Sequence, residues 1–255
     1  MWVLLFGAEV EPDGNVAKAI SFNAALGIFL LSTAAILPYS GLGKRGKAIF
    51  RWSYCVMALY AYGAETIQNV RGVNPRFVID GSAFDNAVAA GFAIVALLLV
   101  LFYLALAVQY FRRKSYEGRP VLVLGIRYAM AAVMLSFGAG ISISINGGLY
   151  VGAEGNILWL HGLGFHALQA LPILSWLAER TAYPASQRQL LLHAAGIAYL
   201  AALVMMAVQT YQGHSVFTWS LLPLLSASCF LITLTVGAVF LYDALRAGGL
   251  ASREI

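Results

Sequence analysis

Seven apolar stretches divide this chain, and each is close to the length that a helix needs to cross a bilayer. A crossing helix takes about 20 predominantly apolar residues, because each residue advances it by only about 1.5 Å. We therefore predict an all-α fold, a polytopic membrane protein with a bundle of seven transmembrane helices. The predicted spans lie near residues 20–39, 52–70, 86–110, 121–146, 157–178, 190–211 and 218–245.

The composition agrees with a membrane protein. Hydrophobic residues make up 61% of the 255 residues and charged residues 11%, against about 45–50% and about 25% in soluble domains. The connections between the apolar stretches are polar and contain glycine and proline, and no internal repeat is apparent. We predict one membrane domain covering residues 1–255. An odd number of spans also argues against a transporter built from two equal repeats.

Charge predicts how the chain is oriented. Basic residues gather in alternate connections, as in 44–51 and 112–119, whereas acidic residues gather on the other side, as in 9–13 and 80–85. Connections rich in Lys and Arg stay in the cytoplasm, which places the N-terminus outside and the C-terminus in the cytoplasm. The net charge of +5 then reflects attraction to anionic membrane lipids and requires no nucleic acid.

Two histidines occupy the predicted fifth span. Hydrocarbon disfavours polar side chains, so His161 and His166 need a reason to be there. They are five residues apart, which is about 140° around a helix, so one ligand cannot easily take both. Gly162, His166 and Gln169 share one stripe at i, i+4 and i+7. This stripe is the centre of the predicted site.

The predicted orientation brings polar residues from other helices to the same depth of the outer leaflet. Glu65 and Gln68 lie in the last turns of the second span, and His214 follows the sixth. Together with the stripe on the fifth span they predict one pocket open toward the outer leaflet. Its lining residues are Glu65, Gln68, His161, His166, Gln169 and His214.

Two kinds of cofactor suit such a pocket. Imidazole and carboxylate are ligands for Zn, Fe or Mn. Alternatively, imidazoles on facing helices ligate haem, with Gly162 leaving room for the macrocycle and Arg71 and Arg76 near its propionates. In both cases His166 is the primary ligand, and His161 or His214 is the second. Gln68 and Gln169 complete the predicted cofactor-binding residues.

A structural role is the competing interpretation. His166, Gln169, Glu65 and Gln68 could hydrogen-bond one another across helices and simply hold the bundle together. No HxxxH, HExxH or CxxCH motif is present, so residue spacing selects neither metal nor haem.

Glu65 has two roles open to it. A carboxylate within an apolar helix suits a catalytic proton acceptor or a cation ligand. The alternative is an ion pair with Arg71 or Arg76 at the outer surface. These two arginines suit an anionic substrate group, a propionate or a lipid phosphate.

Two further features concern packing. The outer half of the fourth span, residues 136–144, is nearly bare of bulky side chains, which favours close helix packing over a cavity wall. Arg127 and Asp243 both lie near cytoplasmic helix ends, and we predict an ion pair between them.

The leading functional hypothesis is an integral membrane protein that binds a metal ion or haem and carries out redox chemistry on a lipophilic substrate. The alternative is a non-enzymatic receptor, transporter or assembly subunit whose pocket binds a small ligand or a partner helix. The expected partners are membrane lipids, a lipophilic or small-molecule ligand, and another membrane protein or a second copy of this chain. The short termini and the lack of disulfide-rich loops predict the bacterial inner (plasma) membrane.

Overall fold

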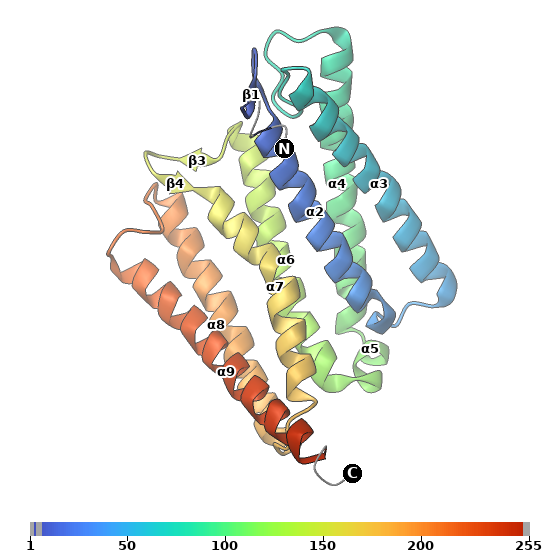
Figure 1. The fold of residues 1–255 in the computed structure, drawn as a ribbon, viewed down its shortest axis with the longest axis vertical. Helices are drawn as coiled ribbons and strands as arrows, with labels where there is room; N and C mark the ends of the chain where they lie inside the picture. Colours follow the sequence, from blue (N-terminus) through green and yellow to red (C-terminus); the bar gives the residue numbers. More distant parts are fainter. Residues whose placement is uncertain (1–2, 4–6, 252–255) are drawn as a thin grey trace. The chain divides into compact units, whose positions relative to one another are not determined.

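The computed structural model describes residue 3 and residues 7–251, and most of these residues are helical (Figure 1). The elements in chain order are β1 (Glu9–Val10), β2 (Gly14–Asn15), α2 (Val16–Ile36), η1 (Leu37–Tyr39), α3 (Lys44–Val70), α4 (Ala83–Phe111), α5 (Arg113–Gly118), α6 (Pro120–Asn146), β3 (Tyr150–Val151), β4 (Gly155–Asn156), α7 (Ile157–Ala178), α8 (Ala185–Tyr211) and α9 (Leu221–Ala251).

Within the described residues, six helices are long and apolar enough to cross a membrane, judged by length and composition. They are α2 with η1, α4, α6, α7, α8 and α9 up to Arg246. These helices indicate a multi-pass integral membrane protein. The helix α3 has 27 residues but is not among the six, and its first two turns carry Lys44, Arg45, Lys47 and Arg51.

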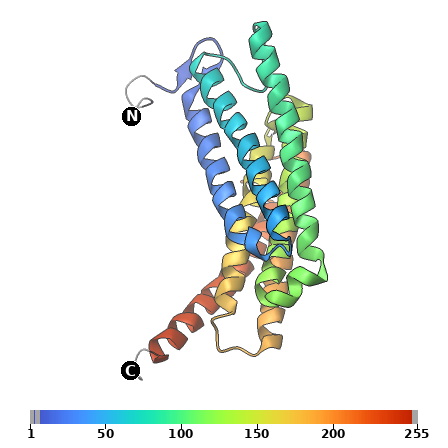
Figure 2. The same ribbon diagram turned by 90° about the vertical axis from the view of Figure 1, so that its right-hand side faces the viewer.

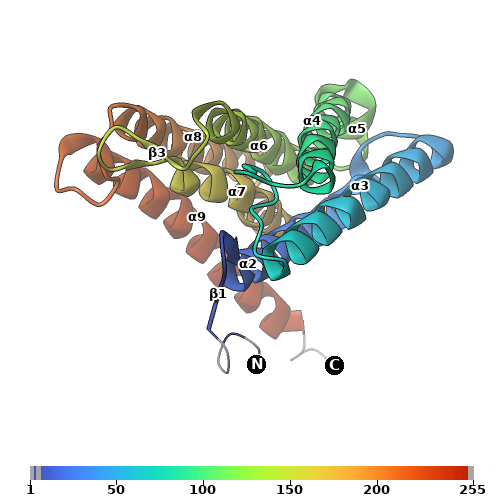
Figure 3. The ribbon, with the colours of Figure 1, turned by 90° about the horizontal axis from the view of Figure 1, so that it is seen from above.

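The chain forms two compact units. The first comprises Met1–Pro38 and Leu42–Leu106, and the second comprises Tyr39–Gly41 and Ala107–Ile255. In the first unit α2 and α3 lie side by side, with the β1–β2 hairpin at one end of the pair (Figure 2). In the second unit α7 packs against α6, and α8 packs against α9 (Figure 3).

Each unit contains the same hairpin followed by the same pair of helices. A two-stranded hairpin ends in Gly14 and Asn15 in the first unit, and in Gly155 and Asn156 in the second. Both asparagines are N-caps: the side chain of Asn15 accepts from the amide of Lys18, and that of Asn156 from the amide two residues on. Side-chain caps satisfy amides that a helix cannot pair internally.

Each hairpin docks on the C-terminal end of the second helix of its pair. The amide of Asp13 donates to the carbonyl of Gly72 at 2.9 Å, and the amide of Glu154 donates to the carbonyl of Gly213 at 3.0 Å. Gly72 and Gly213 have φ values of +78° and +82°, a left-handed conformation that glycine adopts at helix C-termini without steric cost.

The two substructures align without a gap. Each residue of the first lies 141 positions before its counterpart in the second, as Gly14 does before Gly155 and Gly72 before Gly213. The helices α3 and α8 keep this spacing and are both 27 residues long. The repeat therefore covers residues 8–73 and 149–214. The apolar residues in between differ almost everywhere, so the repeat is not apparent from the sequence alone.

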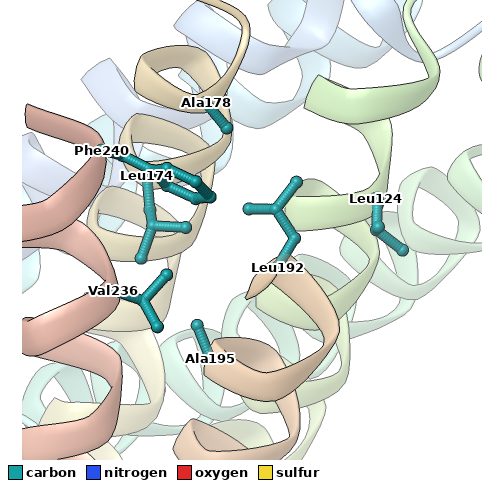
Figure 4. Packing of buried hydrophobic residues seen from close by; sticks show 7 residues of the cluster. All are labelled: Leu124, Leu174, Ala178, Leu192, Ala195, Val236 and Phe240. Carbon is teal, nitrogen blue, oxygen red and sulfur yellow. The ribbon is translucent and has the colours of Figure 1, made fainter. Parts of the chain in front are cut away.

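The core of the second unit lies where its four long helices meet. Its buried residues pack against one another from α6, α7, α8 and α9 (Figure 4). They are Leu124, Leu174, Ala178, Leu192, Ala195, Val236 and Phe240. The first unit instead has an aromatic core, in which Tyr103 is fully buried. Its ring centroid lies 4.8 Å from that of Phe29, and its hydroxyl lies 3.3 Å from that of Thr33.

The predicted ion pair between Arg127 and Asp243 is wrong. The Arg127 guanidinium donates to the carbonyl of Tyr110 at 2.8 Å, and the Asp243 carboxylate accepts from the amide of Ala182 at 2.9 Å. Each group instead satisfies a backbone atom: Arg127 a carbonyl near the end of α4, and Asp243 an amide in the connection between α7 and α8.

An ion pair that the sequence pattern did not reveal joins Arg119, just before α6, to Glu179, just after α7. The Tyr39 hydroxyl accepts a further hydrogen bond from Arg119 at 3.0 Å. The hydrogen bond to Glu179 raises the pKa of Arg119. This pair ties together the ends of the two most closely packed helices of the second unit.

The hairpin junctions generate a stability prediction. A Cβ atom at Gly14 would collide with the carbonyl oxygen of Asn69, and one at Gly155 with that of Thr210. We expect Gly14→Ala and Gly155→Ala each to lower the free energy of unfolding by about 1–3 kcal/mol, the usual cost of overpacking. Thermal unfolding of the purified protein in detergent measures this. Gly148→Ala is the control, because a Cβ there meets nothing within 4 Å.

Candidate functional site

The residues predicted to form one pocket fall in both units. Glu65, Gln68, Arg71 and Arg76 belong to the first unit, and the residues from α7 together with His214 belong to the second. Each set has a defined local geometry. The convergence of the two sets on one pocket stays a prediction.

Glu65 is buried and paired. Its carboxylate forms an ion pair with Arg76 and accepts from the side-chain amide of Asn69 at 3.2 Å. Only 1% of Glu65 is exposed. The Arg76 guanidinium lies 4.9 Å from the ring centroid of Phe22 and 5.4 Å from that of Phe92, a cation–π arrangement. Of the two alternatives that the sequence left open for Glu65, the ion pair is present.

Gln68 and Arg71 share a second carboxylate. The Gln68 side chain donates to Asp85 at 2.9 Å, and Arg71 donates to Asp85 at 2.6 Å and to Gln68 at 2.5 Å. Ser82 completes the shell of Asp85 with its amide at 3.0 Å and its hydroxyl at 2.6 Å. Gln68 and Asp85 are buried, with 0% and 4% exposure.

Asp85 accepts hydrogen bonds from three side chains, a role that its place in the acidic connection 80–85 does not reveal. A signal was available in the spacing of Ser82 and Asp85. The hydroxyl of Ser82 accepts from the amide of Asp85 at 3.3 Å, while the carboxylate of Asp85 accepts from the amide of Ser82. This reciprocal pattern is a capping box at the start of α4.

The repeat shows which part of this network is specific to the first unit. Met206 takes the position of Glu65, and Gln212 takes that of Arg71, so the second unit lacks these charges. Gln209, the counterpart of Gln68, donates to the carbonyl of Ser215 at 3.0 Å. The glutamine therefore contacts the segment that follows its helix in both units, the start of α4 in the first and the loop before α9 in the second. The ion pairs are an addition in the first unit.

His161 is a packing residue between α6 and α7. Its ring Nδ1 lies 2.8 Å from the carbonyl oxygen of Ser136, and the Ser136 hydroxyl donates to the carbonyl of His161. The imidazole rests directly on Gly140, where a Cβ would meet the ring at 2.8 Å. The small residues of the fourth predicted span thus allow close helix packing here, the interpretation that the sequence favoured.

His166 has a different environment. Its Nδ1 lies 3.1 Å from the side-chain oxygen of Gln169, as the shared stripe predicted. The imidazole is exposed on the surface of the second unit. A Cβ at Gly162 would meet nothing within 4 Å, so there is open space one turn before His166. His214 lies in the turn after α8 and is also exposed.

Among the described residues, no group of three or more His, Cys, Asp and Glu side chains is placed to hold a metal ion. Comparison of the chain with protein families, curated proteins and solved structures finds no match.

The buried Glu65–Arg76 pair generates an asymmetric prediction. The side chain of Glu65 is 2% exposed and that of Arg76 37%, so only the arginine can be rehydrated when its partner is removed. We expect Arg76→Gln to lower the free energy of unfolding by about 3–5 kcal/mol, because it leaves a buried carboxylate unpaired. Glu65→Gln costs less, about 1–3 kcal/mol.

Thermal unfolding of both variants and of the double variant measures this asymmetry. The double variant should be more stable than Arg76→Gln alone. Glu117→Gln is the matched control, because its pair with Arg113 is exposed at 61% and 92% and such surface pairs contribute about 0–1 kcal/mol. Equal losses in the two single variants would contradict the prediction.

Proposed function

We propose that α3 is a seventh membrane span and that the N-terminus lies outside. The support comes from the repeat: α3 is the counterpart of α8, and α8 is one of the six helices that are apolar enough to cross a membrane. The basic residues of α3 are confined to its first turns, in 44–51. A basic end of a span stays in the cytoplasm, so α3 would run from inside to outside, as α8 would.

The two hairpins make this topology testable. With seven spans, the exposed tips at Asp13 and Glu154 are on the same side of the membrane, whereas with α3 outside the bilayer they are on opposite sides. In a Cys55→Ser/Cys229→Ser background, we expect Asp13→Cys and Glu154→Cys both to react with an impermeant maleimide added to intact cells. Ser186→Cys, at the start of α8, should react only after permeabilisation.

We propose that this membrane domain binds a small polar ligand and carries it across the bilayer. The observation that carries the proposal is the exposed His166–Gln169 pair, which lies near the middle of the apolar helix α7. A polar pair facing lipid at that depth is costly, and ionisable residues in spans usually face a water-filled cavity or a protein neighbour. An imidazole and an amide beside the open space at Gly162 offer both hydrogen-bond donors and acceptors to a ligand.

The repeat favours transport over the other non-enzymatic roles. Several classes of transporter are built from two repeats of the same orientation. Here the repeated substructure is a hairpin with its pair of helices, and each copy is followed by one more long helix. The helix α6 connects the two groups. The seven spans thus consist of two three-helix groups and one linking helix, and an odd span number does not argue against repeats. The likeness to such transporters is an analogy of architecture. The exposed polar pair is the place where a ligand would bind.

Accessibility of position 166 tests the proposal. In the background without native cysteines, we expect His166→Cys to react with an impermeant maleimide from outside and also in inside-out vesicles, because a transport pathway opens to each side in turn. Leu234→Cys, at an exposed apolar position of α9, is the lipid-facing control and should not react. Reaction from outside alone would indicate a receptor-like pocket, and no reaction from either side would overturn the proposal.

Cofactor binding with redox chemistry is the second candidate function. One observation favours it: Nδ1 of His166 lies 3.1 Å from the side-chain oxygen of Gln169. Acceptors at Nδ1 favour the tautomer in which Nε2 carries the lone pair that a metal ion or haem iron needs. Under this hypothesis the purified protein has a stoichiometric metal or a Soret absorption band, and His166→Ala removes it.

A further inference from the structure

A groove runs along the surface of the second unit between α6 and α8. Its volume is about 720 Å³, within the range of pockets that hold small ligands, about 300–1,000 Å³. Every residue that lines it belongs to the second unit. The lining residues are Met134, Leu135, Gly138, Ala139, Ser142, Leu160, Val204, Ala207, Val208, Tyr211 and Gln212.

The groove changes character along its length. The lining residues farthest from the C-terminal ends of α6 and α8 are apolar, as at Met134 and Val204. Toward the two helix ends it becomes polar, with Ser142, Tyr211 and Gln212. None of the lining residues is charged. Such a gradient, parallel to helices that cross a membrane, matches an amphiphile with an apolar tail and an uncharged head.

The direction of the hydrogen bonds at the polar end defines the head group. The hydroxyl of Ser142 donates to the carbonyl of Gly138 at 3.1 Å, so its only proton is used. The hydroxyl of Tyr211 therefore donates to Ser142, at 2.7 Å. The Tyr211 oxygen keeps its acceptor capacity and has no further proton to give. It is matched by a ligand that donates a hydrogen bond.

We propose that this groove binds a neutral lipid whose hydroxyl head donates to Tyr211 and whose apolar tail lies between α6 and α8. The tail removes exposed apolar side chains such as Leu135 and Val208 from the bulk bilayer and gains packing contacts. The head group extends a series of hydrogen bonds that runs from the ligand through Tyr211 and Ser142 to the Gly138 carbonyl. The proposal needs only that α6 and α8 are embedded in the membrane, and it holds whether or not the protein transports a ligand.

Photolabelling of the full-length protein in lipid nanodiscs tests the proposal. The probe is a diacylglycerol with a diazirine in one acyl chain, and mass spectrometry locates the cross-linked residues. We expect cross-links on the groove residues of α6 and α8. The methyl ether of the same probe cannot donate a hydrogen bond, and it should label about five-fold less, the effect of one neutral hydrogen bond. Diazirine-tailed phosphatidylcholine, which also lacks a donor, should label equally weakly.

Two variants separate the head-group contact from the tail contact. Tyr211→Phe should reduce labelling by diacylglycerol to that of the methyl ether and leave labelling by the ether unchanged. Gly138→Leu should abolish labelling by both, because it fills the groove at a position where a Cβ meets nothing within 4 Å. Gly63→Leu on α3, a helical glycine with the same open surroundings, is the matched control and should label as the unsubstituted protein does.

Specific results would overturn the proposal. These are equal labelling by the three probes, labelling that Gly138→Leu does not change, or cross-links spread over exposed apolar residues of all helices. Each of these would mean that the groove is filled only by bulk lipid or by another part of a protein.

Discussion

The backbone groups at the ends of long apolar helices govern how this chain is arranged. A helix leaves amides unpaired at its start and carbonyls unpaired at its end, and a membrane offers few partners for them. The same kind of hairpin junction meets this need at both helix pairs. A short hairpin provides an asparagine cap for the first helix of the pair. Its turn also donates an amide to a glycine carbonyl just after the second helix of the pair. One element thereby satisfies both helix ends and fixes the two helices side by side.

This junction explains which residues the two halves of the chain share. Gly14 and Gly155 have no space for a side chain, because a carbonyl near the end of α3 or α8 lies against each of them. Gly72 and Gly213 need a positive φ angle. Asparagine supplies the cap. Elsewhere any apolar side chain of suitable size can pack, since the backbone needs no particular residue there, and the sequences have diverged.

The two copies of the repeat also differ in their polar residues. The first unit encloses two ion pairs at the end of α3, and their partners come from the loop that follows and from the start of α4. Both carboxylates are buried and paired, whereas the two arginines are partly exposed. The second unit has neutral residues at those positions and presents its polar side chains, His166 and Gln169, on the surface of α7.

The sequence by itself determined the helices. The predicted span 157–178 coincides with α7, whereas the predicted start near residue 52 lies eight residues after the start of α3 at Lys44. Hydropathy detects only the apolar part of a helix, and the charged first turns of α3 are equally helical. The stripe of His166 with Gln169 was also predicted, because it depends on helix periodicity alone. The ring of His161 facing Gly140 could not be, since it depends on which helices meet.

Only the tertiary structure decided the partners of the polar groups and the existence of the repeat. Glu65 pairs with Arg76 rather than Arg71, and Asp85 accepts from Gln68 and Arg71. The path of the loop determines which of these charged groups come within reach of one another. The repeat of 8–73 in 149–214 depends on a few glycines, asparagines and glutamines in hairpins and helix ends. Residue type constrains the backbone where space or the φ angle is limiting. Everywhere else, packing in three dimensions determines which side chains become neighbours.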